Sequence, residues 1–209
     1  MSKTEKEFFT LLKNEGIREN VIEAFKLFDQ KYFFDQIFTG YFYSHECVPI
    51  GKGEKSDASP VLAKMINNLP SGKDCRILEI GTGSGYSTAI LSRLFSEIVT
   101  VEYYEDFAIS AKERLSKLKI NNVKYLTGDV MDLDDMPVLF DGIIIFAACP
   151  SRPLFLMPYL KEKGVIVFPM GPVYQQQIAV MTNESGGKGS LYKMDFYDFC
   201  NFTPLKGMY

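Results

Sequence analysis

The chain has 209 residues, of which 46% are hydrophobic and 23% are charged, so it is long enough to bury a core and form a globular domain. Its net charge is −3, whereas nucleic-acid-binding proteins usually carry a basic surface. No apolar run reaches the roughly 18 residues that a membrane-spanning helix needs. The four cysteines lack the spacing of a zinc site. We therefore expect free thiols, no bound metal and a cytoplasmic protein without membrane or nucleic-acid partners.

The first part of the chain is expected to be mainly helical. Apolar residues such as Val21 and Phe25 recur at helical spacing, which predicts helix up to Gln36. The stretch Ile37–Lys55 is mixed, with aromatic residues and glycines, and is more typical of strand and loop. A second helical pattern covers Pro60–Leu69, with proline in the first turn.

From residue 71 onward, short apolar strands alternate with helices. Such an alternation is typical of a parallel sheet that is covered on both faces. We predict an α/β fold with a Rossmann-like, doubly wound, mostly parallel sheet and a C-terminal antiparallel hairpin. Residues 1–70 would form a helical, substrate-side extension packed on the 71–209 core, within a single domain 1–209. The expected strands are Arg76–Ile80, Ile98–Val101, Val123–Leu126, Gly142–Phe146 and Val165–Phe168, the helices are Tyr86–Phe95, Glu105–Leu118 and Leu154–Leu160, and the hairpin strands are Ile178–Met181 and Leu191–Phe199.

A glycine-rich segment, Leu78–Ser87, follows the first of these strands and opens a helix with the spacing G-x-G-x-G. Glycines let the backbone approach a ligand closely, and a helix N-terminus offers free N–H groups. The dinucleotide fingerprint G-x-G-x-x-G would need glycine where Tyr86 stands. The segment instead resembles the AdoMet-binding motif of class I methyltransferases; a structural glycine turn is the alternative. The candidate cofactor residues here are Glu79, Gly81, Thr82, Gly83, Ser84, Gly85 and Ser87.

Two further acidic residues stand at the ends of the next two strands. Glu102, followed by Tyr103, ends the second strand, where a Rossmann-type site places a carboxylate for the ribose hydroxyls. Asp129, followed by Val130, comes after the third strand, and the resemblance to methyltransferases implies that it receives the adenine amino group. Each acid alone could be a solvated strand end. Together with the glycine loop, they predict a cofactor site at the carboxyl ends of the strands.

Outside the cofactor motif, five segments match a family pattern: Val48–Gly53, Phe140–Ile145, Ala147–Pro150, Phe168–Pro172 and Phe202–Gly207. In these segments the chain resembles the protein-L-isoaspartate O-methyltransferases. The resemblance implies AdoMet-dependent methylation of isoaspartyl carboxylates in damaged proteins, with S-adenosyl-L-homocysteine as the product. It also implies that Ala147 contacts the cofactor and that Lys52, Ala148 and Gln177 contact the substrate.

The chain departs from this family at its functional triplet, Thr-Ile-Ser, where an ungapped match places Lys55, Ser56 and Asp57. These three residues are the candidate catalytic residues, and a carboxylate stands in place of the family's serine. An ionised Asp57 about 4 Å from an acceptor carboxylate would repel it by about 4 kcal/mol at an effective dielectric of about 20. This repulsion predicts that Asp57→Ser raises activity on isoaspartyl peptides by at least about tenfold. Neutralisation by Lys52 or Lys55, or a loop that turns Ser56 to the substrate, would remove the repulsion.

Two other functions are compatible with the sequence. The protein could be a relative that methylates a different acceptor, such as a modified peptide, a small molecule or RNA, because the triplet is altered. It could also be a non-catalytic AdoMet-binding module that acts through partners. Turnover of AdoMet distinguishes the module from an enzyme, and activity on an isoaspartyl peptide against its aspartyl twin distinguishes the two enzymes.

Overall fold

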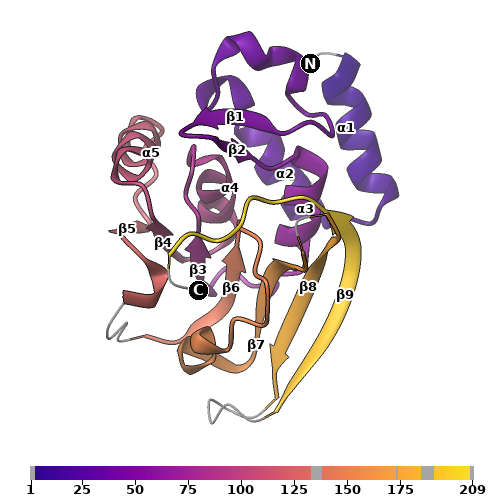
Figure 1. Ribbon diagram of the computed structural model, residues 1–209. Helices are drawn as coiled ribbons and strands as arrows, with labels where there is room; N and C mark the ends of the chain where they lie inside the picture. The colour runs from indigo at the N-terminus through magenta and orange to yellow at the C-terminus, as the bar shows by residue number, and fades with distance from the viewer. Residues whose placement is uncertain (1–2, 133–137, 173, 185–190, 208–209) are drawn as a thin grey trace.

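The computed structural model describes residues 3–132, 138–172, 174–184 and 191–207 of the chain. Its strands β3–β9 form one seven-stranded sheet with the order β5-β4-β3-β6-β7-β8-β9 (Figure 1). Pairing is parallel from β5 to β7, and β8 is antiparallel to both β7 and β9. The expected α/β fold with its C-terminal antiparallel hairpin is confirmed. The strands are β3 (Arg76–Ile80), β4 (Glu97–Glu102), β5 (Val123–Thr127), β6 (Phe140–Ile145), β7 (Leu160–Met170), β8 (Gln176–Asn183) and β9 (Tyr192–Cys200).

The side chains of the sheet build two hydrophobic cores, because successive residues of a strand point to opposite faces. On one face, Ile77 and Ile144 join a core made with the α-helices. On the other face, Leu78 and Ile143 join a second core with two 3-10 turns. The helices are α1 (Lys3–Asn14), α2 (Glu19–Leu27), α3 (Ser59–Asn67), α4 (Tyr86–Leu94) and α5 (Glu105–Lys117), and the turns are η3 (Val130–Asp132) and η4 (Leu154–Tyr159).

The prediction of a helix at Leu154–Leu160 is wrong in its type. The segment is the 3-10 turn η4, because Pro158 lies inside it and has no N–H to donate. The chain then enters β7 at Leu160, earlier than the predicted start at Val165. No helix in the described part of the chain is long and apolar enough to cross a membrane.

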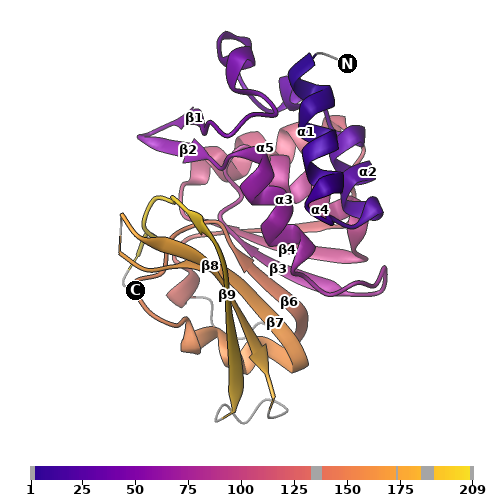
Figure 2. The same ribbon diagram turned by 90° about the vertical axis from the view of Figure 1, so that its right-hand side faces the viewer.

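The N-terminal region also differs from the prediction, since its helix is not continuous up to Gln36. Gly16, with a φ of 72°, follows α1, and the chain leaves helical geometry again after α2. The elements that follow are η1 (Gln30–Tyr32), η2 (Gln36–Tyr41), β1 (Val48–Gly51) and β2 (Glu54–Ser56). Figure 2 shows the β1–β2 hairpin at the same end of the molecule as α1 and α2. Because Phe8 and Phe25 share a core with the sheet, we propose that this extension and the sheet form one domain.

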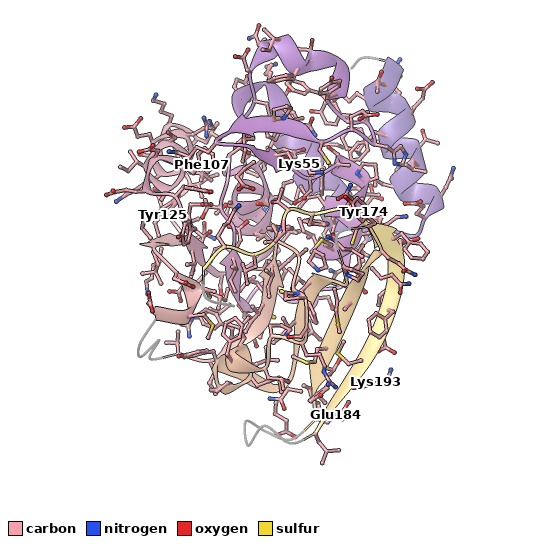
Figure 3. All side chains as sticks on the ribbon, in the orientation of Figure 1. Lys55, Phe107, Tyr125, Tyr174, Glu184 and Lys193 are labelled. Carbon is pink, nitrogen blue, oxygen red and sulfur yellow. The ribbon has the colours of Figure 1, made fainter. Side chains whose placement is uncertain are left out.

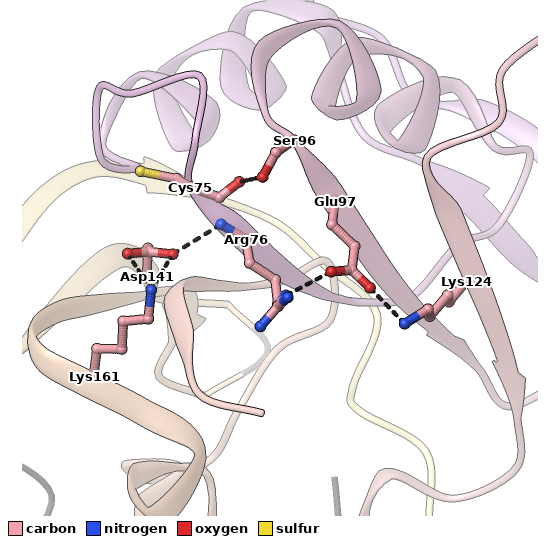
Figure 4. Close-up of polar contacts among 7 residues, drawn as sticks. All are labelled: Cys75, Arg76, Ser96, Glu97, Lys124, Asp141 and Lys161. Carbon is pink, nitrogen blue, oxygen red and sulfur yellow. Dashed lines mark hydrogen bonds and ion pairs between the residues drawn. The ribbon is translucent and has the colours of Figure 1, made fainter. Parts of the chain in front are cut away.

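A network of charged groups joins the amino ends of the parallel strands (Figure 4). Glu97, at the start of β4, accepts hydrogen bonds from Arg76 Nε at 2.6 Å and pairs with Lys124 Nζ at 2.7 Å. Asp141 of β6 accepts from the backbone N–H of Arg76 at 2.8 Å and from Lys161 Nζ at 2.9 Å. The charges at this edge therefore pair with one another.

Candidate active site

A cleft opens at the opposite edge of the sheet, at the carboxyl ends of β3, β4 and β6. It contains about 860 Å³ of space, part of it open to solvent. Ligands of open α/β sheets bind at this edge. Its walls are the glycine loop, the β1–β2 hairpin, the start of α5 and the C-terminal segment. The residues that line it include Ile50, Glu54–Asp57, Ile80–Ser84, Tyr86, Ser87, Val101–Tyr104, Phe107, Gly128, Val130, Phe146, Ala147 and Thr203–Lys206.

The glycine loop owes its shape to three residues with positive φ. Gly81, Gly83 and Gly85 have φ values of 96°, 51° and 81°, a region that other residues rarely adopt. A Cβ on Gly83 would lie 3.2 Å from Ile50 Cδ1, across the cleft on β1. Gly85 is the N-cap of α4, and Ser84 Oγ accepts from the backbone N–H of Tyr86 at 3.3 Å. The loop therefore leaves space for a ligand against backbone N–H groups, which fits a nucleoside cofactor.

Glu79 lies beneath the loop, outside the lining of the cleft. It is fully buried and accepts hydrogen bonds from the hydroxyls of Ser87 at 2.5 Å, Thr88 at 2.6 Å and Thr100 at 2.7 Å. Burial raises the pKa of Glu79 to about 7, and the three hydroxyl donors oppose this rise. Glu79 thus links the end of β3 to the first turn of α4 and to β4.

Glu102 faces the cleft from the end of β4. Its carboxylate accepts from the backbone N–H of Gly83 at 2.8 Å and from that of Tyr104 at 3.0 Å. Burial raises its pKa. A carboxylate has about four acceptor positions, so Glu102 keeps acceptor capacity for donors that enter the cleft. Tyr103 beside it also lines the cleft and is 48% exposed.

The residues after β5 close the side of the cleft below α5. Val130 and Gly128 line it, whereas Asp129 stands just outside the lining. Asp129 Oδ1 accepts from the backbone N–H of Met131 at 2.9 Å, and a Cβ on Gly207 would overlap its carboxylate. The C-terminal segment therefore lies directly against Asp129.

The triplet Lys55, Ser56 and Asp57 lines the wall opposite the glycine loop. Figure 3 shows Lys55, on β2, at the same end of the molecule as Phe107 of α5. Ser56 Oγ donates to the backbone carbonyl of Asp57 at 3.3 Å. Asp57 opens to the cleft but is otherwise enclosed, and this burial raises its pKa well above the usual range, while Lys55 lowers it.

Three predicted substrate residues lie outside this cleft, although Ala147 lines it. Lys52 pairs with Asp106 at 2.8 Å, on the exposed side of the hairpin. Ala148 is buried, and its backbone bonds to Thr203 and Leu205. Gln177 on β8 donates to the carbonyl of Tyr197 at 3.1 Å.

The main feature without a sequence-based prediction is a C-terminal strap, Thr203–Lys206, which forms part of the cleft wall. Glu54 of β2 holds it, since Glu54 Oε2 accepts from Thr203 Oγ1 at 2.9 Å and Oε1 lies 3.2 Å from Lys206 Nζ. Tyr104 OH also reaches Glu54, at 3.4 Å. The signal in the sequence was the resemblance of Phe202–Gly207 to a family ending, which gave no reason to place it over the cleft.

Comparison with known families gives an assignment. The model of the protein-L-isoaspartate(D-aspartate) O-methyltransferase family matches residues 3–207. The chain belongs to this family. A protein-L-isoaspartate O-methyltransferase of Sodalis glossinidius is 35% identical over 197 residues, which cover 93% of this chain and 91% of that protein. The corresponding enzyme of Klebsiella pneumoniae (strain 342) is 32% identical over 206 residues, covering 98% and 97%.

Solved structures of protein-L-isoaspartate O-methyltransferases share the fold. A Plasmodium falciparum protein of this description, in complex with S-adenosyl-L-homocysteine, superposes with a TM-score of 0.79 at 23% identity, covering 98% of this chain and 99% of the other. The expectation of an AdoMet-dependent O-methyltransferase is thus confirmed at the level of the family. No group of three His, Cys, Asp or Glu side chains among the described residues is arranged to hold a metal ion.

Proposed function

We propose that this protein transfers the methyl group of AdoMet to the carboxylate of isoaspartyl residues in other proteins. The observation that carries the proposal is that the β2 triplet and the glycine loop form opposite walls of one cleft, in a chain that matches the isoaspartate family from residue 3 to 207. A cofactor on the loop would then face an acceptor on the triplet. We further propose that the substrates are damaged proteins of the cytoplasm.

The residues of the chain supply positioning and not acid–base chemistry. AdoMet brings a methyl group on a positively charged sulfur, which leaves as a neutral thioether. The acceptor carboxylate is ionised near pH 7 and needs no base. Catalysis then depends on holding the two reactants in line and away from water.

We assign the cofactor contacts as follows. The remaining acceptor capacity of Glu102 would receive the ribose hydroxyls, while Gly81 and Gly83 give the cofactor close access to the backbone. Val130 and Ala147 would pack against its base, with Asp129 at the edge. Glu79 would act through the loop, since it does not reach the cleft.

A second acceptor class is supported by one observation, the carboxyl of Asp57 in the triplet wall. If that carboxyl is ionised during the reaction, a neutral or cationic acceptor fits the wall better than an isoaspartyl carboxylate. The alternative enzyme is therefore a methyltransferase of this family with a neutral or cationic acceptor.

The test is transfer of labelled methyl from AdoMet to an isoaspartyl peptide, beside the same peptide with ordinary aspartate. We expect label in the first peptide only, in a base-labile form typical of an ester. Label in neither peptide would reject the proposed substrate. A protein that binds S-adenosyl-L-homocysteine but does not turn over AdoMet, whichever acceptor is offered, would be a binding module instead.

A further inference from the structure

Asp57 differs from the other acidic groups of the cleft in its partners. In the described part of the chain, no other residue donates a hydrogen bond to its carboxyl or forms an ion pair with it. Glu54, by contrast, is paired with Lys206, and Glu102 is held by two backbone N–H groups. Apart from a hydrogen bond with its own backbone N–H, Asp57 therefore presents its carboxyl to the cleft without a partner among the described residues.

The nearby cations do not neutralise this carboxyl directly. Lys52 is paired with Asp106 at 2.8 Å, and Lys206 with Glu54 at 3.2 Å. Lys55 influences Asp57 through its charge without a direct ion pair. Ser56 points its hydroxyl at the backbone carbonyl of Asp57 and not at the carboxyl. Lys52 and Ser56 are thus engaged elsewhere, and Lys55 acts on Asp57 only through its charge.

We propose that Asp57 enters the reaction as a neutral carboxylic acid. Its O–H donates a hydrogen bond to one oxygen of the acceptor carboxylate, and Asp57 so determines specificity for an anionic acceptor. This assignment rests on the proposed function. Two carboxyl groups that share one site share a proton, because both cannot remain charged at short distance. The second oxygen of the acceptor stays free to form the bond to the methyl carbon, and Asp57 keeps its proton throughout.

The surroundings of Asp57 favour the neutral form. Burial raises the pKa of its carboxyl well above the usual range for aspartate, and Lys55 is the one opposing charge. The thiols of Cys47 and Cys200 also feel the charge of Asp57, and burial raises the pKa of both thiols, so they stay neutral. As pH rises through the raised pKa of Asp57, the donor becomes an anion that repels the acceptor. The activity on isoaspartyl peptides that Asp57→Ser is expected to gain should then appear only at pH values above the raised pKa of Asp57.

The first test observes the proton without turnover. The infrared difference spectrum of wild type minus Asp57→Asn should contain the carbonyl band of a protonated carboxyl. That band should titrate away well above the ordinary aspartate pKa of about 3.9. A band that has already vanished near that ordinary value would overturn the proposal.

The second test compares kcat/KM on an isoaspartyl peptide for wild type and Asp57→Asn, whose amide donates at every pH. The ratio of wild type to variant should fall at least about tenfold as pH rises from below to above the point at which the infrared band disappears, mainly through KM. Taking this ratio removes the effect of other titrating groups such as Glu79. The matched control is Asp106→Asn, an exposed carboxylate outside the cleft, for which the ratio should stay constant.

The outcomes separate this assignment from the proposed function. An active enzyme whose ratio does not change with pH overturns the role of Asp57 alone. A wild-type protein that methylates no isoaspartyl peptide at any of these pH values overturns the substrate and this assignment together. Binding of S-adenosyl-L-homocysteine, measured by calorimetry at both pH values, should be equal in wild type and Asp57→Asn, and a parallel loss of binding would overturn the assignment to the acceptor.

Discussion

The two edges of the sheet use acidic residues in opposite ways. At the amino ends, Glu97 and Asp141 are paired with Arg76, Lys124 and Lys161 near the surface (Figure 4). At the carboxyl ends, Glu79 and Glu102 are buried, and their partners are hydroxyls and backbone N–H groups. At the amino edge, the charges are paired within the protein. At the carboxyl edge, the carboxylates can still accept hydrogen bonds from a ligand.

Strand β4 shows this contrast within six residues, because it begins and ends with glutamate. Lysine and arginine lower the pKa of Glu97, first through the hydrogen bond from Lys124. Burial raises the pKa of Glu102. The ionised form of glutamate is therefore stabilised at one end of the strand and disfavoured by burial at the other. A pKa that burial raises in this way is typical of functional sites.

The largest effect on the carboxyl edge should come from Gly83→Val. The new side chain would narrow the gap to Ile50, and we expect affinity for S-adenosyl-L-homocysteine to fall by about 100-fold or more, about 3 kcal/mol. Calorimetry measures this directly. The control is Gly16→Val, which has a similar backbone strain at a φ of 72° but no neighbour within 4 Å. Equal affinity in both variants would mean that the cofactor does not use this wall.

The next effect is on stability, through Glu79. Its pKa rises from 4.5 to about 7 on folding, so its contribution is fully present below about pH 4.5 and is lost as pH rises through about 7, a change of about 3 kcal/mol. We expect Glu79→Gln to remove that part of the pH dependence. The measurement is urea unfolding of both proteins on each side of pH 7. Parallel stability curves would show that Glu79 ionises normally in the fold.

A smaller effect should separate the two ends of β4. Glu102→Ala should weaken binding of S-adenosyl-L-homocysteine by about 1–3 kcal/mol, because a charge-assisted acceptor for two hydroxyls is lost. Glu97→Ala is the matched control on the same strand and should leave that affinity unchanged. If both variants bind alike, Glu102 is a structural cap of the glycine loop and not a cofactor ligand.

The smallest effect belongs to the amino edge. Arg76→Met keeps the apolar stem but removes the ion pair with Glu97, and partly exposed pairs contribute about 0.5–1 kcal/mol. We expect a loss of that size in the free energy of unfolding, with AdoMet turnover retained. The loss should shrink at high salt, since salt screens such pairs. A loss that is independent of salt would indicate packing by the Arg76 side chain.

Most of the fold could be predicted because its signals are local. The apolar strands Arg76–Ile80 and Val123–Leu126 and the helix near Glu105 have clear periodicity, and the structure places elements there. The prediction failed at Leu154–Leu160, where apolar residues alone suggested a helix but Pro158 restricted it to a 3-10 turn. In the N-terminal region, periodicity showed helical character without locating the breaks.

The site was predictable where it lies on the strand ends and less so where it depends on tertiary contacts. The glycine loop and Glu102 follow directly from the order of strands. Glu54 and the strap, in contrast, come together only because chain segments about 150 residues apart meet, with Thr203 and Glu54 separated by 149 positions. No local sequence pattern predicts such a contact. The same is true of the enclosure that shifts the pKa of Asp57.

The strap also affects how the protein becomes functional during synthesis. Thr203–Lys206 are synthesised after all seven strands of the sheet, yet they form part of the cleft wall and rest against Glu54. The sheet can begin to fold as the chain emerges, since folding proceeds from the N-terminal side during translation. The cleft, however, stays incomplete until Thr203–Lys206 have emerged and packed against it. A nascent or truncated protein would thus have the scaffold of the enzyme before it can enclose a substrate.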